Sequence, residues 1–374
     1  MSKPDVQDLR CLVIKIGSSL LIDADDRLDR GWLDALADDI AALRADGRQV
    51  IVVSSGAVAL GARSLGIDRG RARLESLQAC AAAGQVQLVH AYQEALGRHD
   101  IQAAQVLLTP DDTEVKRRFL NARGTLEKLL EHGVVPIVNE NDTVATDELR
   151  YGDNDRLAAR VAQTVMADLL VLLSDVDGFY DADPSTNDNA KFFDVVESIG
   201  EEHLRMAGDS ASGVGSGGMN TKLRAAQIAT HAGCATIIAS GAEAHPVRRL
   251  FDGARHTLFP ATASPAAARK QWLAGMLKVS GSLQLDDGAV AALAAGKSLL
   301  PVGVSGVDGA FGRGDAVSLM DGQGTELGRG LAAYSSVEAQ AIMGRRSADI
   351  EEILGYRGRS VLVHRDDMVL FDRK

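Results

Sequence analysis

Two lysines, Lys15 and Lys222, occupy positions from which they could share one anionic ligand. Lys15 interrupts an apolar run that is typical of a buried strand, and this run is followed directly by "GSS" (17–19). Lys222 lies at the start of a helical pattern, just after the glycine-rich stretch "SGVGSGGMNT". A lone lysine in a strand is more often an edge residue whose ammonium reaches water. Two lysines beside helix N-terminal amides suit a phosphate better, and they indicate stabilisation of charge during phosphoryl transfer.

The glycine-rich stretch also contains a formal G-x-G-x-x-G pattern at Gly213, Gly215 and Gly218. A dinucleotide fold needs this pattern directly after a strand, with an acidic residue about twenty positions further on. Here "MAGDSAS" precedes it and the acid is not in place, so a nicotinamide dinucleotide is disfavoured. A loop for nucleotide phosphates is the favoured interpretation, and a plain glycine-rich surface loop is the alternative. The later "AAGKS" (294–298) lacks the first glycine of a P-loop.

A third polar cluster lies between Asn139 and Ala162, where Asp142 of "NEND" and Asp153 of "GDND" are eleven residues apart. Asp142 could pair with a substrate ammonium, Asn154 could bind a carboxylate together with backbone amides, and Asp155 could hold a lysine. Solvated turns are the alternative, because Asn and Asp are common in turns. None of the eight histidines falls in these clusters. A carboxylate acceptor, which is already ionised and needs no general base, therefore fits better than an alcohol.

The elements that must position these residues alternate between strand and helix through about the first 250 residues. Helical patterns occur, for example, at 30–47 and 121–133. This order predicts an α/β fold, with a mainly parallel sheet between layers of helices. The small polar clusters follow the expected strands, as expected for a site at the carboxyl ends of a parallel sheet. Strands are expected at 11–16, 49–54, 102–108, 134–138, 169–174 and 235–239.

The pattern changes near 255–272, where proline and alanine replace the strand–helix rhythm. We therefore expect a first domain over 1–260, a linker over 261–272, and a second domain over 273–374. Glycines and turn signals at short intervals in the last part predict a small, mainly β, barrel-like module.

Composition and charge narrow the class of protein. Hydrophobic residues make up 46% and charged residues 24%, which is ordinary for a globular chain. Residues 269–374 carry 13 basic and 13 acidic side chains, so the first 268 carry the whole net charge of −11. This acidic front part argues against non-specific binding to nucleic acid. Three scattered cysteines and the absence of a signal-like or membrane-length apolar segment predict a cytoplasmic protein.

The chain resembles the glutamate 5-kinase family of the amino acid kinase superfamily over nearly its whole length. Each matching block is moderately specific, and all of them in this order are highly specific. The tail, which contains "ILGYRGRSVLVHRDDMV", resembles a PUA domain. The blocks are "VIKIGSSLL", "VVSSGAVALG", "RRFLNARGTL", "VVPIVNENDTVATDELRYGDNDRLAA", "LLSDVDGFYDADP" and "SGVGSGGMNTKLRAAQIA".

The resemblance implies ATP-dependent phosphorylation of the γ-carboxylate of L-glutamate, the first step of proline biosynthesis. It implies Lys15 and Lys222 at the transferring phosphate, with Asp155 orienting both lysines. Glutamate would be held by Ser55, Asp142 and Asn154. ATP would be held by Lys15, Ser174, Asp175, Ser216, Gly217, Gly218, Met219, Asn220, Thr221 and Lys222. One departure is mild: Ser174 stands where relatives often have threonine, and the hydroxyl is kept.

The same resemblance implies Mg²⁺ carried in on ATP and no metal cage of protein side chains. It also implies a homo-oligomer, a dimer or tetramer, with feedback inhibition by L-proline; the residues themselves decide neither. Acetylglutamate kinase, aspartokinase, carbamate kinase and uridylate kinase share the fold, but they lack the PUA-like tail. An RNA-binding protein with a scaffold front domain is the alternative from another class, and the tail's zero net charge disfavours it.

Overall fold

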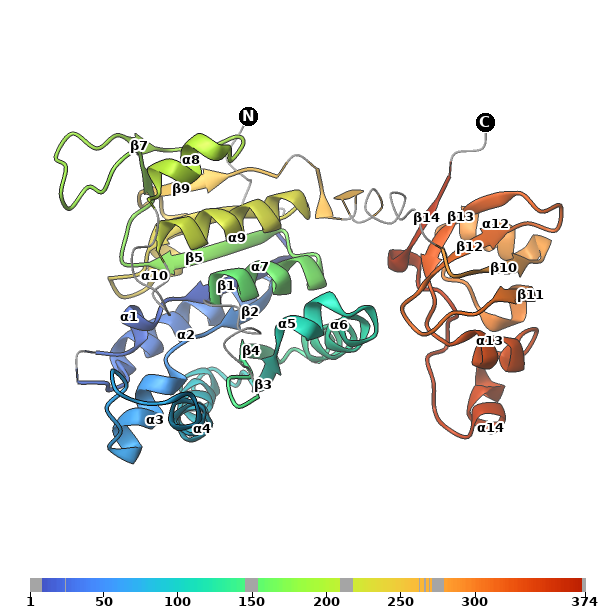
Figure 1. Ribbon diagram of the computed structural model, residues 1–374, viewed down its shortest axis with the longest axis horizontal. Helices are drawn as coiled ribbons and strands as arrows, with labels where there is room; N and C mark the ends of the chain where they lie inside the picture. Colours follow the sequence, from blue (N-terminus) through green and yellow to red (C-terminus); the bar gives the residue numbers. More distant parts are fainter. Residues whose placement is uncertain are drawn as a thin grey trace. The chain divides into compact units, whose positions relative to one another are not determined.

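The computed structural model describes residues 9–23, 25–144, 154–208, 218–261, 263–265, 267–268, 270 and 279–371, except for the side chain of Lys116. Contacts between residues divide the chain into two compact units. The first contains residues up to 114 and 121–265, and the second contains 115–120 together with the residues from 266 onward. Figure 1 shows a helix-rich first unit and a smaller, strand-rich second unit.

A seven-stranded sheet forms the centre of the first unit. Its order is β3-β4-β2-β1-β5-β8-β9, and every neighbouring pair is parallel except β8 and β9. The mainly parallel α/β fold is therefore confirmed. The strands are β1 (Cys11–Ile16), β2 (Gln49–Val53), β3 (Ala103–Leu108), β4 (Val135–Glu140), β5 (Leu169–Ser174), β8 (Ala235–Ser240) and β9 (His256–Phe259).

Helices cover both faces of this sheet (Figure 1). One face packs against α1 (Ser18–Leu21), α2 (Arg30–Ala45), α3 (Ala57–Leu65), α4 (Leu74–Gly97) and α10 (Pro246–Phe251). The other packs against α6 (Lys116–Glu131), α7 (Asn154–Val165) and α9 (Met219–His231). The short helices α5 (Pro110–Glu114) and α8 (Glu201–Met206), and the hairpin of β6 (Phe179–Tyr180) and β7 (Phe192–Phe193), complete the described part of this unit.

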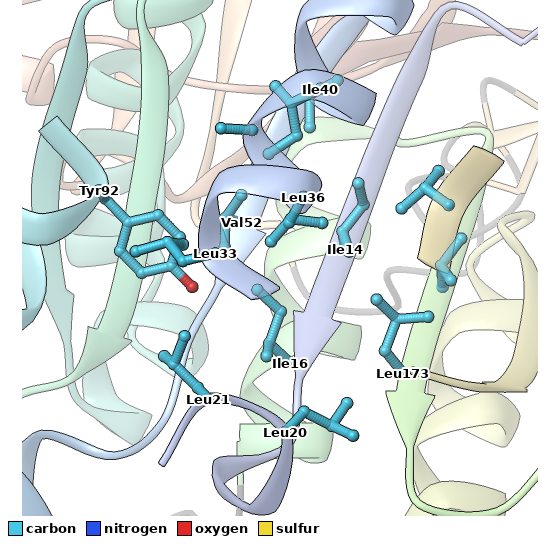
Figure 2. Close-up of a cluster of buried hydrophobic side chains, with 14 of the residues drawn as sticks. Ile14, Ile16, Leu20, Leu21, Leu33, Leu36, Ile40, Val52, Tyr92 and Leu173 are labelled. Carbon is cyan, nitrogen blue, oxygen red and sulfur yellow. The ribbon is translucent and has the colours of Figure 1, made fainter. Parts of the chain in front are cut away.

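Strand β1 lies in the middle of the sheet and is buried on both faces. Ile14 and Ile16 belong to the core on the α2 side, where Figure 2 shows them beside Leu36 and Leu173. Val13 belongs to the core on the α7 and α9 side. Because side chains alternate along a strand, Lys15 shares the side of Val13. Lys15 is thus a buried residue of a central strand, not an edge residue that reaches water.

The expected strands agree with the observed ones to within a residue or two at each end. The strands at 11–16 and 169–174 have the expected bounds, and the helix expected at 30–47 is α2. The helix expected at 121–133 begins five residues earlier, at Lys116, because "KRRFL" continues the helical pattern. The antiparallel strand β9 lies outside the expected set, since it is only four residues long and a proline follows it.

The second unit contains a five-stranded sheet in the order β11-β10-β12-β13-β14. Neighbouring strands are antiparallel except for the parallel pair β10 and β12, so the mainly β character is confirmed. Leu283, Leu319 and Tyr334 lie in its own hydrophobic core. The elements are β10 (Gly281–Leu285), α12 (Asp287–Ala294), β11 (Val304–Gly309), β12 (Ala316–Met320), β13 (Glu326–Leu331), α13 (Ser336–Ile342), α14 (Ile350–Leu354) and β14 (Met368–Leu370).

Helices α3 and α4 touch backbone to backbone at a pair of glycines. A Cβ atom on Gly84 would lie 1.8 Å from the carbonyl oxygen of Ala57, and one on Gly61 would lie 1.8 Å from that of Cys80. No side chain fits into either gap. The contact therefore fixes how closely α4 approaches the loop between β2 and α3, where Ser55 lies.

We predict that Gly84→Ala lowers the free energy of unfolding by about 1–3 kcal/mol, because the added methyl group forces the two helices apart. A Cβ atom added to Gly97, at the end of the same helix, would have nothing within 4 Å. Gly97→Ala is thus the matched control, and it should stabilise the helix by up to about 1 kcal/mol. Thermal unfolding followed by circular dichroism measures both changes. Equal midpoints for the two variants would show that the helices do not touch as described.

Candidate active site

The candidate site lies where the chain changes direction across the sheet. Strand β1 has β2 on one side and β5 on the other, and the later strands add beyond β5. Such a switch point opens a crevice at the carboxyl ends of the strands, where α/β folds bind ligands. Lys15 is the penultimate residue of β1, and Ser174 is the last residue of β5. Two of the predicted site residues therefore lie near the carboxyl ends of neighbouring strands, where such a crevice is expected.

A buried carboxylate joins the two lysines. Asp155 Oδ1 lies 2.5 Å from Lys15 Nζ, and Asp155 Oδ2 lies 3.3 Å from Lys222 Nζ. The hydroxyl of Thr221 lies 3.0 Å from the same Oδ2. Asp155 is 0% exposed and each lysine is 5% exposed, so these charges are held out of water. We call Lys15, Asp155 and Lys222 the charge triad.

Three elements bring the charge triad together from positions far apart in the sequence. Strand β1 directs Lys15 to the side of the sheet that α7 and α9 cover. Asp155 is the second residue of α7, and Lys222 lies in the first turn of α9. The N-termini of both helices, with their positive dipole ends, thus lie beside the same two ammonium groups. The arrangement favours a polyanionic ligand.

Opposing effects act on the ionisation of Asp155. Burial alone would raise its pKa, but Lys15 and Lys222, with a hydrogen bond from Thr221, lower the pKa below its usual value. Asp155 is therefore an anion at neutral pH. One carboxylate between two ammonium groups leaves a net positive charge, which a phosphate can neutralise.

Asn154, the residue before Asp155, serves a second group of polar side chains. Its Nδ2 lies 2.7 Å from the carbonyl oxygen of Ser54, 2.8 Å from Ser55 Oγ and 2.9 Å from Asn139 Oδ1. These acceptors fix the amide nitrogen toward the protein. Its Oδ1 accepts no hydrogen bond from any residue that the structure describes, so Asn154 is set to accept from a ligand such as an ammonium. The expected carboxylate contact would need the opposite orientation.

The remaining predicted ligand residues lie at other strand ends of the same sheet. Asp142 is half-exposed in the turn after β4. Ser174 Oγ donates to Asp175 Oδ1 at 2.8 Å, directly after β5. Strands β4 and β5 both run parallel to β1. Asp142, Ser174 and Asp175 therefore lie at the carboxyl ends of the strands, which is the end of the sheet where the charge triad lies.

The start of α9 carries the predicted nucleotide loop only in part. Gly218 is the N-cap of the helix. Met219 packs against the core, and Asn220 Oδ1 accepts from Arg224 Nε at 2.7 Å. Thr221 and Lys222 turn toward Asp155. Ser216 and Gly217 lie outside the described residues.

The structure offers no competing chemistry from cysteine. Cys11, Cys80 and Cys234 are free and buried, as expected for small hydrophobic side chains. Burial, helped by Asp168, raises the pKa of Cys11 to about 12, so its thiol stays protonated. In the described ranges, no helix is both long and apolar enough to cross a bilayer.

Sequence reasoning missed two buried amides beside Asn154. Asn139 lies within the "NEND" block, and Gln85 lies on α4 with its Oε1 2.8 Å from Asn139 Nδ2. The signal for Asn139 is its place at the end of an apolar strand. For Gln85 it is only a polar residue on an otherwise apolar helical face, which is weak.

Comparison with known proteins agrees with this geometry. The model of the amino acid kinase family matches residues 10–240, and that of the PUA domain matches residues 281–354. The first match covers the charge triad and every strand of its sheet except β9. The chain belongs to the amino acid kinase family.

Within the amino acid kinase family, the chain is similar to proteins named glutamate 5-kinase. The protein of Paramagnetospirillum magneticum is 57% identical over 360 residues, which are 96% of this chain and 97% of the relative. That of Dinoroseobacter shibae is 57% identical over 362 residues, 96% of this chain and 98% of the relative. Glutamate 5-kinase 1 of Rhizobium meliloti is 55% identical over 365 residues, 98% of this chain and 93% of the relative.

We predict that Asp155→Asn lowers the free energy of unfolding by about 3–5 kcal/mol, because it leaves two buried ammonium groups without a counter-charge. Thermal unfolding measures the loss. The control is Glu94→Gln, which weakens an exposed ion pair with Arg30. Water screens this pair, so the midpoint of this control should hardly move. A fully stable Asp155→Asn protein would mean that the lysines do not depend on this carboxylate.

Proposed function

We propose that this kinase transfers the γ-phosphoryl group of ATP to the γ-carboxylate of L-glutamate. The product is L-glutamyl 5-phosphate, and the reaction is the first step of proline biosynthesis. The chain's similarity to glutamate 5-kinases along almost its full length supports the substrate. The charge triad is the single structural observation that carries the reaction type.

The chemistry needs charge stabilisation more than proton transfer. A carboxylate oxygen of glutamate forms a bond to the γ-phosphorus, and the bond from that phosphorus to the bridging oxygen of ADP breaks. The glutamate carboxylate is ionised at neutral pH, so no general base is required. Negative charge shifts onto the equatorial and leaving oxygens, where Lys15 and Lys222 act as preorganised donors.

Asp155 acts as an orienting residue in this step. Its two oxygens take one lysine each, which fixes both ammonium groups at the crevice before ATP binds. A preorganised site avoids the cost of reorienting charges during the reaction. Ser174, Asp175 and the segment from Ser216 to Lys222 are the proposed nucleotide contacts.

Glutamate recognition is assigned to the other side of the α7 N-terminus. Asp142 supplies a carboxylate for the substrate ammonium, and Asn154 Oδ1 supplies a second acceptor. The Ser55 hydroxyl lies 2.8 Å from Asn154 Nδ2, so it lies at the same end of the sheet. Because Asn154 and Asp155 are consecutive, glutamate and the transferring phosphoryl group meet at one helix N-terminus.

Mg²⁺ is the proposed cofactor, bound together with ATP. In the described part of the chain, no three His, Cys, Asp or Glu side chains gather as a metal cage. The ion would arrive on the phosphates of ATP, as is usual for this cation. When bound, Mg²⁺ would neutralise phosphate charge that the two lysines alone do not balance.

A hydroxamate assay tests the proposed substrate. The full chain is incubated with ATP, Mg²⁺ and hydroxylamine, which traps an acyl phosphate as a coloured hydroxamate. Glutamate should give the product, whereas acetylglutamate and aspartate should give little. Faster turnover of acetylglutamate would assign the chain to another specificity within its family.

We predict that Lys15→Met and Lys222→Met each lower kcat by roughly 10²-fold or more, the scale expected for losing one preorganised donor. Both variants should fold, because methionine fills a similar volume. Lys128→Met is the control, since Lys128 is exposed on α6. A near-normal kcat for either variant would remove that lysine from the mechanism.

We predict that Asp142→Asn raises the KM for glutamate and leaves the KM for ATP nearly unchanged. The lost partner of the ammonium corresponds to about 2–5 kcal/mol of recognition. Initial rates at varied glutamate and then at varied ATP measure the two constants. Parallel loss of both affinities would instead mean that the turn after β4 had collapsed.

The remaining proposals concern the localisation, oligomeric state, regulation and domain division of the enzyme. We infer a cytoplasmic homo-oligomer, a dimer or tetramer, that L-proline inhibits. The expected division into residues 1–260, a linker at 261–272 and a PUA-like domain at 273–374 is kept as a proposal. In it, the first domain alone binds both substrates.

A further inference from the structure

We infer that Gln85 is a positioning residue for glutamate recognition, and that it acts through Asn139 on Asn154. This inference rests on the proposed function, because it concerns how the same site orients its substrate. We call Gln85, Asn139 and Asn154 the amide relay.

The amide relay connects helices on the two faces of the sheet, near the carboxyl end of β4. Gln85 lies on α4, which packs against one face, and Asn154 begins α7, which packs against the other. Asn139, the fifth residue of β4, joins them. Its Nδ2 donates to Gln85 Oε1 at 2.8 Å, and its Oδ1 accepts from Asn154 Nδ2 at 2.9 Å. Gln85 is 7% exposed and Asn139 is 3% exposed, so water does not compete for these bonds.

Backbone groups fix which way each amide faces. The carbonyl oxygen of Ser54 can only accept, so Asn154 must turn its Nδ2 toward it. The backbone N–H of Glu140 can only donate, so Asn139 must turn its Oδ1 toward it. The Nδ2 of Asn139 is then left pointing at Gln85, which must offer its Oε1. Only this orientation of the three amides satisfies both the Ser54 carbonyl oxygen and the Glu140 N–H.

That orientation leaves a donor of Gln85 unsatisfied. Its Nε2 is buried and has no hydrogen-bond partner among the described residues. A buried unpaired donor lowers the stability of the folded state, and native proteins keep few of them. An apolar side chain would fill this position on α4 without that cost. The glutamine is therefore better explained by what its Oε1 does for Asn139 than by stability.

The packing around Gln85 also helps to position the residues that contact Asn154. Gly84, the preceding residue, lets the backbone of α4 touch that of α3, which brings Gln85 close to the loop after β2. In that loop, Ser54 Oγ lies 3.0 Å from the hydroxyl of Tyr92, another α4 residue, labelled in Figure 2. Burial raises the pKa of Tyr92, so its phenol stays neutral. Helix α4 thus holds Ser54 and Asn139 in place at two points.

The relay determines whether Asn154 presents its donor, Nδ2, or its acceptor, Oδ1, to the substrate. With the relay intact, Asn154 turns its Oδ1 to the ligand side and can accept from the ammonium of glutamate. If Asn139 lost its partner on α4, its buried Nδ2 would have to turn to find another acceptor. The contact with Asn154 would then loosen, and the acceptor for the ammonium would no longer be fixed.

Gln85→Met tests the relay, because methionine has a similar length and lacks the amide. We expect the KM for glutamate to rise about tenfold, the scale of one misplaced hydrogen bond to a charged group. The KM for ATP and kcat should change by less than twofold. The thermal midpoint should fall only slightly, because the variant exchanges one buried unpaired donor, Gln85 Nε2, for another, Asn139 Nδ2, and loses one hydrogen bond. Gln87→Met, at an exposed position of the same helix, should change nothing.

A merely structural link between α4 and β4 predicts a different result. Gln85→Met would then lower the thermal midpoint and leave both KM values unchanged, or raise them together, and either outcome overturns the inference. The stabilisation of each protein by added glutamate gives a second readout that does not depend on turnover. It should be weaker in Gln85→Met and normal in Gln87→Met.

A double-mutant cycle tests whether Gln85 acts through Asn139. In an Asn139→Ala background the relay is already broken, so adding Gln85→Met should change the KM for glutamate by less than twofold. Additive effects would show that Gln85 does not act through Asn139. If the wild type forms no glutamyl hydroxamate, the proposed function and this inference both fall. If the wild type is active and Gln85→Met matches it, only the inference falls.

Discussion

The site depends on one buried carboxylate that binds two ammonium groups. Without Asp155, Lys15 and Lys222 would be like charges held out of water at the end of the sheet, and neither would stay in place. With Asp155 between them, the group keeps a net positive charge that a phosphoryl group can neutralise. The need to bury this group explains why Lys15 lies on a central strand and why two helices begin beside it.

The first two residues of α7 have separate roles in the proposed reaction. Asp155 contacts the two lysines proposed for phosphoryl transfer, and Asn154 contacts the polar groups proposed to recognise the amino acid. Because the two residues are adjacent, a shift of this helix end would move both groups together. The hydrogen bonds to Ser54 and Asn139 and, behind them, the contact with α4 oppose such a shift. The proposed mechanism therefore couples recognition and chemistry through one helix end.

Much of the fold could be predicted from the sequence, because buried parallel strands such as Leu169–Ser174 are continuous apolar runs. The two lysines could be selected by type and by the loops beside them. Their common contact, Asp155, is 140 residues from Lys15. The residue types suggested that Asp155 could hold one lysine, but only the resemblance to a known family implied that it contacts both. Gln85 could not be found, because a glutamine in a helix usually faces water and its partner lies 54 residues away. Long-range polar contacts leave no local pattern.

The most direct test is a crystal structure of the full chain with ADP, Mg²⁺, aluminium fluoride and L-glutamate, in which the fluoride replaces the transferring phosphoryl group. We expect Lys15 Nζ and Lys222 Nζ both within about 3 Å of the fluoride, with Asp155 still between the two lysines. A fluoride group bound away from either lysine, with the charge triad unchanged beside it, would rule out this role for the charge triad.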